Sequence, residues 1–371
     1  MERMRIAIDA SRTTLARRTG TERYALALLR AMLALDSPHT FLLYHRAEPP
    51  PGLLPGGPRA IHRVIPFPRL WTHLRFAAAL WAERPDVTFV PAHVLPLVFP
   101  GPAVVTVHDL GYHYFPEAHP GWPRRYLEWS TRYSARRATL ILADSQATRR
   151  DLAAVYAVEP DKVRVVYPGV DETLSPISDP GKLVRVRQRY GLPARYLLFL
   201  GTLQPRKNIA RLVQAYASSG LYGQGVGLVL AGARGWLYDP RWTEGVPGVA
   251  ETGYVDDADV PALYGGAVAL AFPSLYEGFG FPVLEAMRCG TPVITSNTSS
   301  LPELAGDAAL TVDPLDVEAL AAALRRVVED AALRAQLVEK GYAQAARFTW
   351  QRAAGAALSA LEEAACWGRG V

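Results

Sequence analysis

The chain has 371 residues, of which half are hydrophobic and a fifth are charged; this composition excludes a mainly disordered protein. The length exceeds what one hydrophobic core usually serves, so we expect two domains. No run approaches the roughly 18 apolar residues of a spanning helix, and the first ten residues are too charged for a signal peptide. Two cysteines are too few for a disulfide framework, so we expect a cytoplasmic protein.

The net charge of +5 is unevenly distributed along the chain. Residues 1–171 hold 22 Lys and Arg against 15 Asp and Glu, a balance of +7, whereas residues 172–371 hold 18 against 20, a balance of −2. The asymmetry predicts that the N-terminal half meets an anion: a nucleic acid, an anionic membrane surface or a phosphorylated substrate. Solvated arginines on helix faces explain it equally well.

Strand-like runs alternate with helical patterns, which indicates a parallel α/β architecture. In the first half the pattern predicts helices at 21–35, 70–83, 124–137 and 146–156, and strands at 5–9, 41–44, 61–65, 87–90, 104–107, 139–143 and 163–167. The plan then starts again, with helices at 209–217, 260–265 and 283–289, a helical tail from 317 onward, and strands at 196–201, 226–231, 249–252, 268–271, 293–295 and 308–312.

Residues 168–180, PGVDETLSPISDP, lack periodicity and are rich in Pro, Ser and Asp, so we interpret them as a linker. We therefore divide the chain into two α/β domains, an N-terminal one at 1–170 and a C-terminal one that starts at 171. Two such domains that face one another form a cleft, and their ligands bind at the carboxyl ends of the strands.

The strongest local signal is PSLYEGFGFPVLEAMRCGTPVI, residues 273–294. Glycines before a helix let backbone N–H groups approach an anion, and the helix dipole favours that anion. Glu277 in the loop and Glu285 on the helix suit hydroxyl-rich partners, such as a sugar and a ribose. The alternative is that Glu285 pairs on the surface and the glycines only turn the chain. A dinucleotide G-x-G-x-x-G is excluded, because its third position is Val283.

A second signal is the pair of cations Arg206 and Lys207, between a strand that ends at Gly201 and the next helix. Two adjacent cations at a strand–helix junction can neutralise a diphosphate and the charge that develops when a nucleoside diphosphate departs. The alternative is a solvated basic turn.

Two further candidates follow strands in the first half. Gly20 opens a helix after a loop that contains Arg12, Arg17 and Arg18, where its N–H can meet a phosphate or merely turn the chain. His108, followed by Asp109, ends a strand. Its imidazole can bond a sugar hydroxyl or manage a proton, or it can be a structural histidine.

Asp257 and Asp259 match a D-x-D pattern that can hold a divalent metal. They precede a predicted helix, and Asp is a preferred N-cap residue. Arg206 and Lys207 already supply the positive charge that Mg²⁺ or Mn²⁺ would bring to phosphates. We therefore expect capping and no metal site.

The stretch 122–150 combines basic and aromatic residues, which suits an anionic membrane surface. Aromatic side chains at helical spacing can equally form a core. Against Glu128 and Asp144, the stretch contains Arg124, Arg125, Arg132, Arg136, Arg137, Arg149 and Arg150, interleaved with Trp122, Tyr126, Trp129 and Tyr133.

With these motifs the chain resembles family 4 of the retaining glycosyltransferases, also called glycosyltransferase group 1, over nearly its whole length. The most specific part is E-G-F-G-F-P-x-L-E at 277–285, which looks like the family's E-x7-E motif. Also typical are G-T-L-x-P-R-K-N at 201–208, S-Q-A-T-R-R-D-L at 145–152 and V-Y-P-G-V-D at 166–171. The resemblance implies a GT-B fold, two Rossmann-like domains facing across a cleft. It also implies that the C-terminal domain ends near 350 and that a helix at 351–371 crosses back to the N-terminal domain.

The resemblance implies a donor site for a nucleotide diphosphate sugar, used without metal or cofactor. Arg206 and Lys207 would hold the pyrophosphate, Glu285 the ribose, and Glu277 the transferred sugar. Gly20 would lie by the β-phosphate, His108 near the sugar and Val255 beside the base. The implied catalytic residues are His108, Glu277, Arg206 and Lys207. The implied donor-binding residues are Gly20, Gly201, Arg206, Lys207, Val255, Glu277, Gly278, Phe279, Gly280, Leu284 and Glu285.

The loop T-G-x-x-R-Y at 19–24 resembles family members that use GDP-mannose and build surface polysaccharides, which favours mannosyl transfer to a glycan or lipid-linked acceptor. UDP-glucose and UDP-N-acetylglucosamine are alternative donors. No residue stands out as a covalent nucleophile, so we favour same-face attack assisted by the leaving phosphate. We expect the acceptor in the loops at 12–18 and 66–73.

Two other functions remain as alternatives. A sugar-nucleotide 2-epimerase on a similar fold needs carboxylates from the first domain, where Asp109 is the only obvious candidate, and a non-catalytic sensor would bind donor without turnover. We expect no nucleic-acid partner, and peripheral contact with the inner face of a membrane through the basic N-terminal domain.

Overall fold

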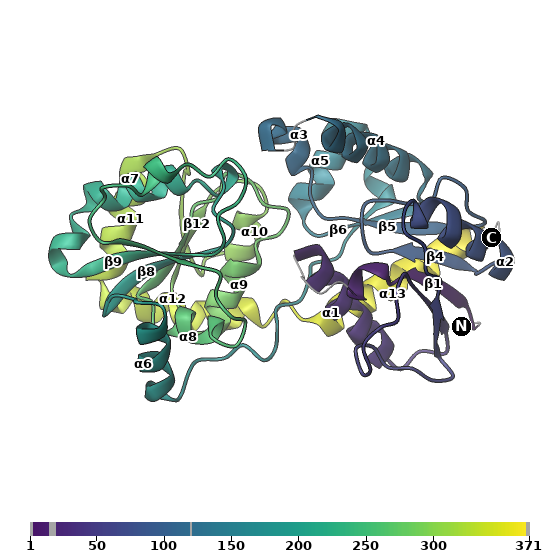
Figure 1. Ribbon diagram of the computed structural model, residues 1–371, viewed down its shortest axis with the longest axis horizontal. Helices are drawn as coiled ribbons and strands as arrows, with labels where there is room; N and C mark the ends of the chain where they lie inside the picture. Colours follow the sequence, from purple (N-terminus) through teal and green to yellow (C-terminus); the bar gives the residue numbers. More distant parts are fainter. Residues whose placement is uncertain (1–2, 15–19, 119–120, 369–371) are drawn as a thin grey trace. The chain divides into compact units, whose positions relative to one another are not determined.

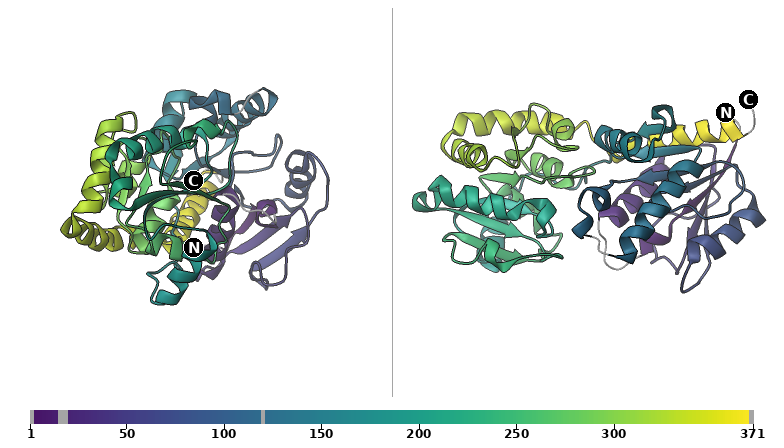
Figure 2. Two further views of the ribbon diagram at one scale, coloured as in Figure 1. Left: turned by 60° about the vertical axis from the view of Figure 1, so that its left-hand side comes forward. Right: turned by 90° about the horizontal axis from the view of Figure 1, so that it is seen from above.

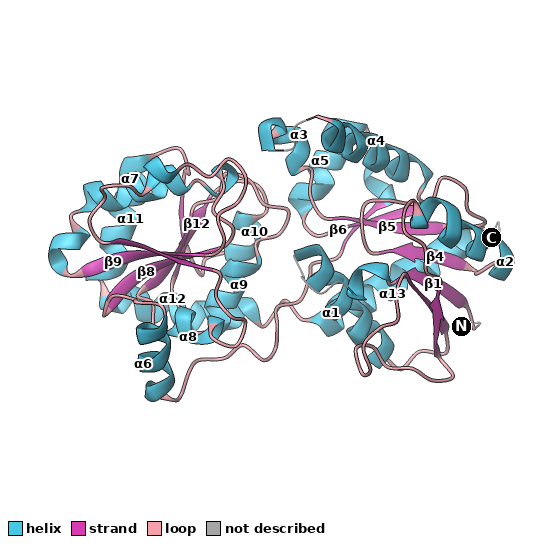
Figure 3. Cartoon of the chain, viewed as in Figure 1, coloured by secondary structure: helices cyan, strands magenta, loops and turns pink. Residues whose placement is uncertain are grey.

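The computed structural model describes residues 3–14, 20–118 and 121–368. The chain forms two compact units: unit 1 comprises Met1–Gly169 and Thr349–Val371, and unit 2 comprises Val170–Phe348. In each unit, helices flank a parallel sheet (Figures 1 and 3). The predicted α/β class, with two Rossmann-like sheets, is confirmed.

Unit 1 is built on a seven-stranded parallel sheet of order β3-β2-β1-β4-β5-β6-β7. Its strands are β1 (Arg5–Asp9), β2 (Thr40–His45), β3 (Ala60–Val64), β4 (Val87–Val90), β5 (Ala103–Val107), β6 (Leu140–Ala143) and β7 (Val163–Val165). Its α-helices are α1 (Gly20–Ala34), α2 (Ala77–Glu83), α3 (Gly111–Tyr114), α4 (Trp122–Arg137), α5 (Gln146–Tyr156) and α13 (Trp350–Gly368). Short helices are η1 (Ser11–Thr14), η2 (Thr72–Phe76), η3 (Pro116–Ala118) and η4 (Pro160–Lys162).

The central strands of unit 1 are apolar runs because both faces of the sheet are covered. Successive side chains of a strand point to opposite faces. Ile6 and Ile8 accordingly belong to one core cluster, and Ala7, between them, belongs to a second. The sheet thus separates two hydrophobic cores, and polar residues gather where the strands end.

Unit 2 is built on a six-stranded parallel sheet of order β10-β9-β8-β11-β12-β13. Its strands are β8 (Arg195–Leu200), β9 (Val226–Ala231), β10 (Val249–Gly253), β11 (Ala269–Phe272), β12 (Val293–Ser296) and β13 (Leu310–Val312). Its α-helices are α6 (Pro180–Arg189), α7 (Ile209–Ser219), α8 (Val260–Gly265), α9 (Phe281–Arg288), α10 (Leu301–Ala305), α11 (Val317–Glu329) and α12 (Ala331–Ala345). Short helices are η5 (Pro205–Lys207), η6 (Leu221–Gln224) and η7 (Pro240–Trp242).

The last helix, α13, belongs to unit 1, where it lies along α1 (Figures 1 and 2). Its buried alanines and Leu361 join the same core cluster as Ile6 and Ile8. His39 Nε2 lies 2.9 Å from Glu362 Oε1, which attaches the helix to the loop before β2. The chain therefore leaves unit 1 after Gly169 and returns to it at Thr349.

Three α-helices have no counterpart among the predicted elements: α3, which has only four residues, α6 and α10. Helix α6 follows Asp179, whose side chain accepts a capping hydrogen bond from the Gly181 N–H, with Pro180 in the first turn. Helix α10 has five residues, too few for a helical period to be visible in the sequence. The predicted helix at 70–83 begins as the π-helical turn η2 and continues as α2. Among the described residues, no helix has the length and apolar composition needed to cross a bilayer.

Replacing Leu361 by alanine should destabilise unit 1, because this fully buried side chain of α13 fills the core beneath α1. A buried Leu→Ala change typically costs about 2–5 kcal/mol. Urea unfolding followed by circular dichroism should show a lower midpoint for L361A. L315A, at a side chain that is 60% exposed, is the control and should unfold like the wild type; equal midpoints for the two variants would contradict the packing of α13.

Candidate active site

Unit 2 brings three of the predicted site residues into one ion-pair cluster. Arg206 and Lys207 lie in η5 after β8, and Glu277 follows β11, the neighbouring strand. Arg206 Nη1 donates to Glu277 Oε2 at 3.0 Å, and Lys207 Nζ donates to Oε1. The Lys207 ammonium also lies 4.9 Å from the centroid of the Phe272 ring, at the end of β11. The cluster contains two cations and one anion, so it keeps a formal charge of +1.

The Glu277 carboxylate is buried and stays ionised. Burial alone would raise its pKa, but the charges of Arg206 and Lys207 outweigh burial and lower the pKa from its usual 4.5 to about 2. The stability that the cluster contributes is therefore present above pH 4.5 and is lost as the pH falls towards 2. At neutral pH, Glu277 is a hydrogen-bond acceptor only.

Two adjacent serines hold the loop that carries Glu277. The Glu277 N–H donates to Ser299 Oγ at 3.0 Å, and the buried Ser300 hydroxyl contacts the carbonyls of Glu277, at 3.0 Å, and Phe279. Ser299 itself has φ +53°, a strained conformation for a residue with a side chain. These serines were missed in the sequence because they lie 21 to 23 positions from the residues that they contact.

Gly280 occupies a position that only glycine fits without strain. Its φ is +118°, and a Cβ there would lie 2.7 Å from Cδ2 of Leu301. Helix α9 starts directly after it, with Pro282 in its first turn. Gly278 and Phe279 are buried in the same loop, and Leu284 is fully buried on α9.

Glu285 is partly buried on α9. Its Oε2 accepts a hydrogen bond of 2.9 Å from the hydroxyl of Tyr264 on α8. Val255 is buried between β10 and α8. Tyr264 thus connects the helix of Glu285 to the helix that follows Val255.

Glycines lie at the carboxyl ends of three neighbouring strands of unit 2, β8, β9 and β10. The Gly201 N–H donates to the Ala231 carbonyl at 2.9 Å, and the Gly232 N–H donates to the Gly253 carbonyl at 2.8 Å. A Cβ on Gly232 would lie 2.1 Å from the carbonyl oxygen of Gly201. Gly232 is therefore the steric partner of Gly201, and the sequence analysis did not name it.

The turn that carries the two cations is fixed by Asn208. Asn208 has φ +62°, and its Nδ2 donates to the carbonyls of Pro273 at 3.1 Å and Pro314 at 2.7 Å. Asparagine tolerates this left-handed conformation better than most residues. Asn208 therefore ties η5 to the segment that follows β11, where Glu277 lies.

The expected role of Asp257 and Asp259 as caps needs correction. Asp259 stands at the N-cap position of α8, but its side chain makes no capping hydrogen bond. Its Oδ2 accepts instead from Arg189 Nη1 at 2.7 Å and from the Tyr190 hydroxyl at 3.0 Å. Within the described ranges, no three His, Cys, Asp or Glu side chains are grouped as metal ligands.

Gly20 is the first residue of α1 and is exposed. Arg12, in η1, donates from Nη1 to Oε1 of the buried Glu22 at 3.0 Å, so this part of the predicted phosphate-binding loop is ion-paired within unit 1. The other two arginines of the loop, Arg17 and Arg18, lie outside the described residues, as does most of the predicted acceptor loop at 12–18.

His108 forms a buried pair with Asp144, a residue that the sequence analysis did not propose for the site. His108 Nδ1 lies 2.7 Å from Asp144 Oδ2. The two residues follow β5 and β6, which pair with Val107 opposite Ala143. The rule that singled out His108, a polar residue at the carboxyl end of a strand, would have found Asp144 as well.

Asp144 changes the protonation of His108. Burial lowers the pKa of His108, but the Asp144 carboxylate beside it outweighs burial and raises the pKa above 6.5. His93, whose ring lies 5.4 Å from that of His108, behaves in the opposite way: burial and the neighbouring His108 lower its pKa to about 3. Nε2 of His108 has no hydrogen-bond partner among the described residues, although the Pro91 carbonyl is near enough to help raise its pKa.

Besides Asp109, the obvious candidate in the sequence, unit 1 buries two carboxylates at the ends of strands of its sheet. Asp144 contacts the imidazole, and Asp9, which ends β1, is also buried. Asp109 itself accepts a hydrogen bond of 2.8 Å from the Gly111 N–H at the start of α3.

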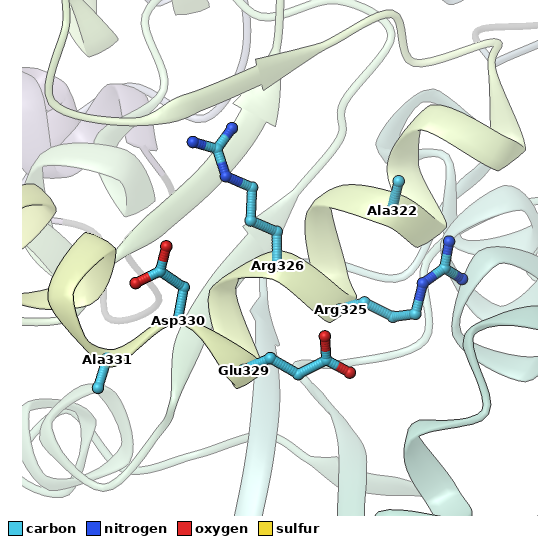
Figure 4. A pocket seen from close by; sticks show the side chains of 6 residues that line it. All are labelled: Ala322, Arg325, Arg326, Glu329, Asp330 and Ala331. Carbon is cyan, nitrogen blue, oxygen red and sulfur yellow. The ribbon is translucent and has the colours of Figure 1, made fainter.

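Two surface hollows lie away from these clusters. One, of about 540 Å³, lies where α11 meets α12 (Figure 4). The other, of about 310 Å³, lies beside α6 and includes Asp259. Neither hollow is lined by a residue of the predicted catalytic or donor-binding sets. The larger one is lined by Ala322, Arg325, Arg326, Glu329, Asp330 and Ala331.

Comparison with known proteins first defines the class. The structure of sucrose-phosphate synthase from Thermosynechococcus elongatus superposes with a TM-score of 0.72 at 22% identity, covering 97% of this chain and 98% of that chain. Together with two parallel Rossmann-like sheets, this similarity identifies the GT-B glycosyltransferase fold.

The sequence then defines the family. The pattern described as "Glycosyl transferases group 1" matches residues 186–344, and "Glycosyltransferase Family 4" matches residues 18–174. "O-antigen chain mannosyltransferase B" of Escherichia coli is 39% identical over 256 residues, 67% of each chain. "Serotype-specific mannosyltransferase WbdA" of Escherichia coli is 32% identical over 235 residues, 60% of this chain but only 28% of WbdA. The chain belongs to glycosyltransferase family 4, the group 1 glycosyltransferases.

Replacing Gly280 by alanine should disrupt the Glu277 loop, because the new Cβ would meet Leu301 in a backbone conformation unsuited to alanine. We expect a loss of stability of about 1–3 kcal/mol and weaker binding of nucleoside diphosphates. Thermal unfolding with and without GDP measures both effects. G223A, where a Cβ meets no neighbouring atom, is the control; G280A behaving like G223A would refute the steric argument.

Replacing Asp144 by asparagine should lower the pKa of His108, because the anion that stabilises the imidazolium is removed while the site stays buried. In the wild type, the stability that protonated His108 gains from Asp144 is present below pH 6.5 and is lost as the pH rises through the raised pKa. An NMR titration of the His108 ring protons, assigned with an H108A variant, measures the change. D161N, at an exposed position of unit 1, is the control; an unchanged titration in D144N would disprove the coupling.

Proposed function

We propose that this enzyme is a retaining, metal-independent mannosyltransferase that uses GDP-mannose and a glycan or lipid-linked acceptor. The observation that carries the proposal is the cluster of Arg206, Lys207 and Glu277 at the carboxyl ends of β8 and β11. Two of its relatives are described as mannosyltransferases, one of O-antigen chains, which supports mannose as the sugar. The loop T-G-x-x-R-Y at 19–24 supports the same donor.

Arg206 and Lys207 would hold the donor pyrophosphate and neutralise the GDP that departs. Charge develops on the leaving phosphate oxygen in the transition state, and fixed cations in a partly buried site stabilise it without reorganising. The formal +1 charge of the cluster favours a dianionic ligand over a neutral one. This role explains why a divalent metal is not needed for the reaction that we propose.

Glu277 and Glu285 would hold the two hydroxyl-bearing parts of the donor. An ionised carboxylate accepts hydrogen bonds only, so Glu277 suits the hydroxyls of the transferred mannose and Glu285 those of the ribose. Val255 would lie beside the base. The remaining proposed donor-binding residues contribute backbone groups or shape, and they are Gly20, Gly201, Gly278, Phe279, Gly280 and Leu284.

His108 would contact the transferred sugar from unit 1. Nδ1 is held by Asp144, so Nε2 is the atom that can meet a sugar hydroxyl. We propose that the acceptor attacks from the same face as the departing GDP, assisted by the leaving phosphate, because none of the carboxylates described above is free of a structural partner. This route retains the configuration of the sugar.

Replacing Glu277 by alanine should reduce mannosyl transfer by about 10²–10³, the usual cost of losing one polar contact to the transition state. GDP affinity should change by less than about tenfold, because Arg206 and Lys207 remain. Release of GDP from GDP-mannose and isothermal titration with GDP measure the two quantities. E318A, an exposed position on α11, is the control, and undiminished turnover in E277A would sink the proposed role.

A further inference from the structure

Helix α4 of unit 1 packs in an unusual way. Its buried residues are small and mostly polar, namely Ser130, Thr131, Ser134 and Ala135. A helix on a protein core normally turns its large apolar side chains inward. Here Trp122 and Trp129 point outward, with 76% and 49% of their surface exposed. These two tryptophans are therefore not part of a core, which was the second of the two interpretations of this stretch.

The exposed side chains of α4 form a single stripe. Spacings of three and four residues place side chains on one face of a helix. At these spacings, two tryptophans and three arginines share the exposed face: Trp122, Arg125, Trp129, Arg132 and Arg136.

A row of rings joins α4 to the segments on either side. The Trp129 ring lies between those of Tyr126, at 6.1 Å, and Tyr133, at 5.8 Å. The Tyr126 hydroxyl is 3.1 Å from Nε2 of His73, and the Tyr133 hydroxyl donates to the Leu97 carbonyl at 2.5 Å. Segments 69–75 and 97–98 are thus held beside the helix.

Both flanking segments also expose large apolar side chains. Leu70 is 63% exposed and Val98 is 60% exposed, and Leu74 and Leu97 are exposed as well. Leu70 has φ +55°, a backbone conformation that costs energy for a leucine. We call the combined surface of α4, 69–75 and 97–98 the α4 face.

The charges of the α4 face are almost all positive. The flanking segment adds the exposed Arg69 and Arg75 to the arginines of the stripe. Along α4, Glu128 is the one acidic residue, and it is paired with Arg124 at 3.1 Å. Exposed apolar side chains among arginines therefore distinguish this surface from an ordinary solvated helix face.

We propose that the α4 face docks on a bilayer that contains anionic phospholipids. Tryptophan suits the boundary between headgroups and acyl chains, where Leu70, Leu74, Leu97 and Val98 can bury apolar surface. The arginines contact lipid phosphates while their apolar stems lie along the surface. The face overlaps the predicted acceptor loop at 69–73, but it contains no residue of the proposed catalytic or donor-binding sets, so the inference does not rest on the proposed donor site.

A single-stranded nucleic acid is the other anion that combines with arginine and aromatic rings. Bases stack on aromatic rings, but they make no comparable contact with exposed leucine and valine side chains. Acyl chains match these side chains directly. The apolar residues of 69–75 and 97–98 therefore favour the lipid surface.

The test is co-flotation of the full chain with vesicles of phosphatidylcholine alone or mixed with phosphatidylglycerol. The wild type should float with the mixed vesicles, weaken as salt is added and ignore pure phosphatidylcholine. Each arginine near an anionic surface strengthens binding about fivefold, so R125E/R132E should bind at least about tenfold more weakly. W122A/W129A should lose binding by a similar factor.

Matched controls carry the same changes elsewhere. R187E/R195E alters the net charge equally on exposed positions of unit 2, and W367A removes another exposed tryptophan; both should bind vesicles like the wild type. All variants should keep the far-ultraviolet circular dichroism and the cooperative thermal unfolding of the wild type, which shows that they are folded whether or not the donor site binds GDP.

Three results would overturn the inference: α4-face variants that float like the wild type, a wild type that binds neither kind of vesicle, or binding to an oligonucleotide in place of mixed vesicles.

Discussion

The structure of the candidate site in unit 2 depends on one buried carboxylate held between two cations. Glu277 would be costly to bury as an anion without Arg206 and Lys207, and each cation would be costly at a partly buried strand end without Glu277. Asn208 fixes the cations from one side, and Ser299 and Ser300 fix the carboxylate from the other. These contacts all come from the chain itself, and a loop held in this way suits the electrostatic stabilisation of a leaving diphosphate that we propose.

The same arrangement occurs in unit 1 with different chemistry. His108 and Asp144 follow adjacent parallel strands, as Arg206 and Glu277 follow β8 and β11. In each case, the pairing of parallel strands brings together polar groups that lie dozens of residues apart in the sequence. A buried charge, which would be costly alone, thereby gains a hydrogen-bond partner of opposite charge. One pair raises the pKa of an imidazole above 6.5 and the other lowers that of a carboxyl to about 2, so each pair favours the charged form of its group.

The sequence predicted the strands and helices, whose patterns repeat, and the site residues that lie directly before a helix. It missed residues whose roles depend on contacts between distant segments. Alternating strands and helices predicted both sheets, because a parallel strand covered on two faces must be an apolar run. Gly280 and the cations of η5 were visible beside their helices. Ser300 and Gly232 were not, since their roles arise only when distant strands or loops meet. The Asp259 side chain could either cap α8 or pair with a cation. It pairs with Arg189, which lies 70 residues away in the sequence.

The central claim is that the cluster of Arg206, Lys207 and Glu277 binds the diphosphate of a sugar nucleotide without metal. The most direct test is the melting temperature of the purified chain with GDP, UDP, ADP and their sugar conjugates, with and without EDTA, because a ligand of the native state raises it by mass action. The account predicts a rise with GDP and GDP-mannose that EDTA does not change and that R206A/K207A abolishes. A wild type that no nucleotide stabilises, or a rise that survives the loss of both cations, would contradict it.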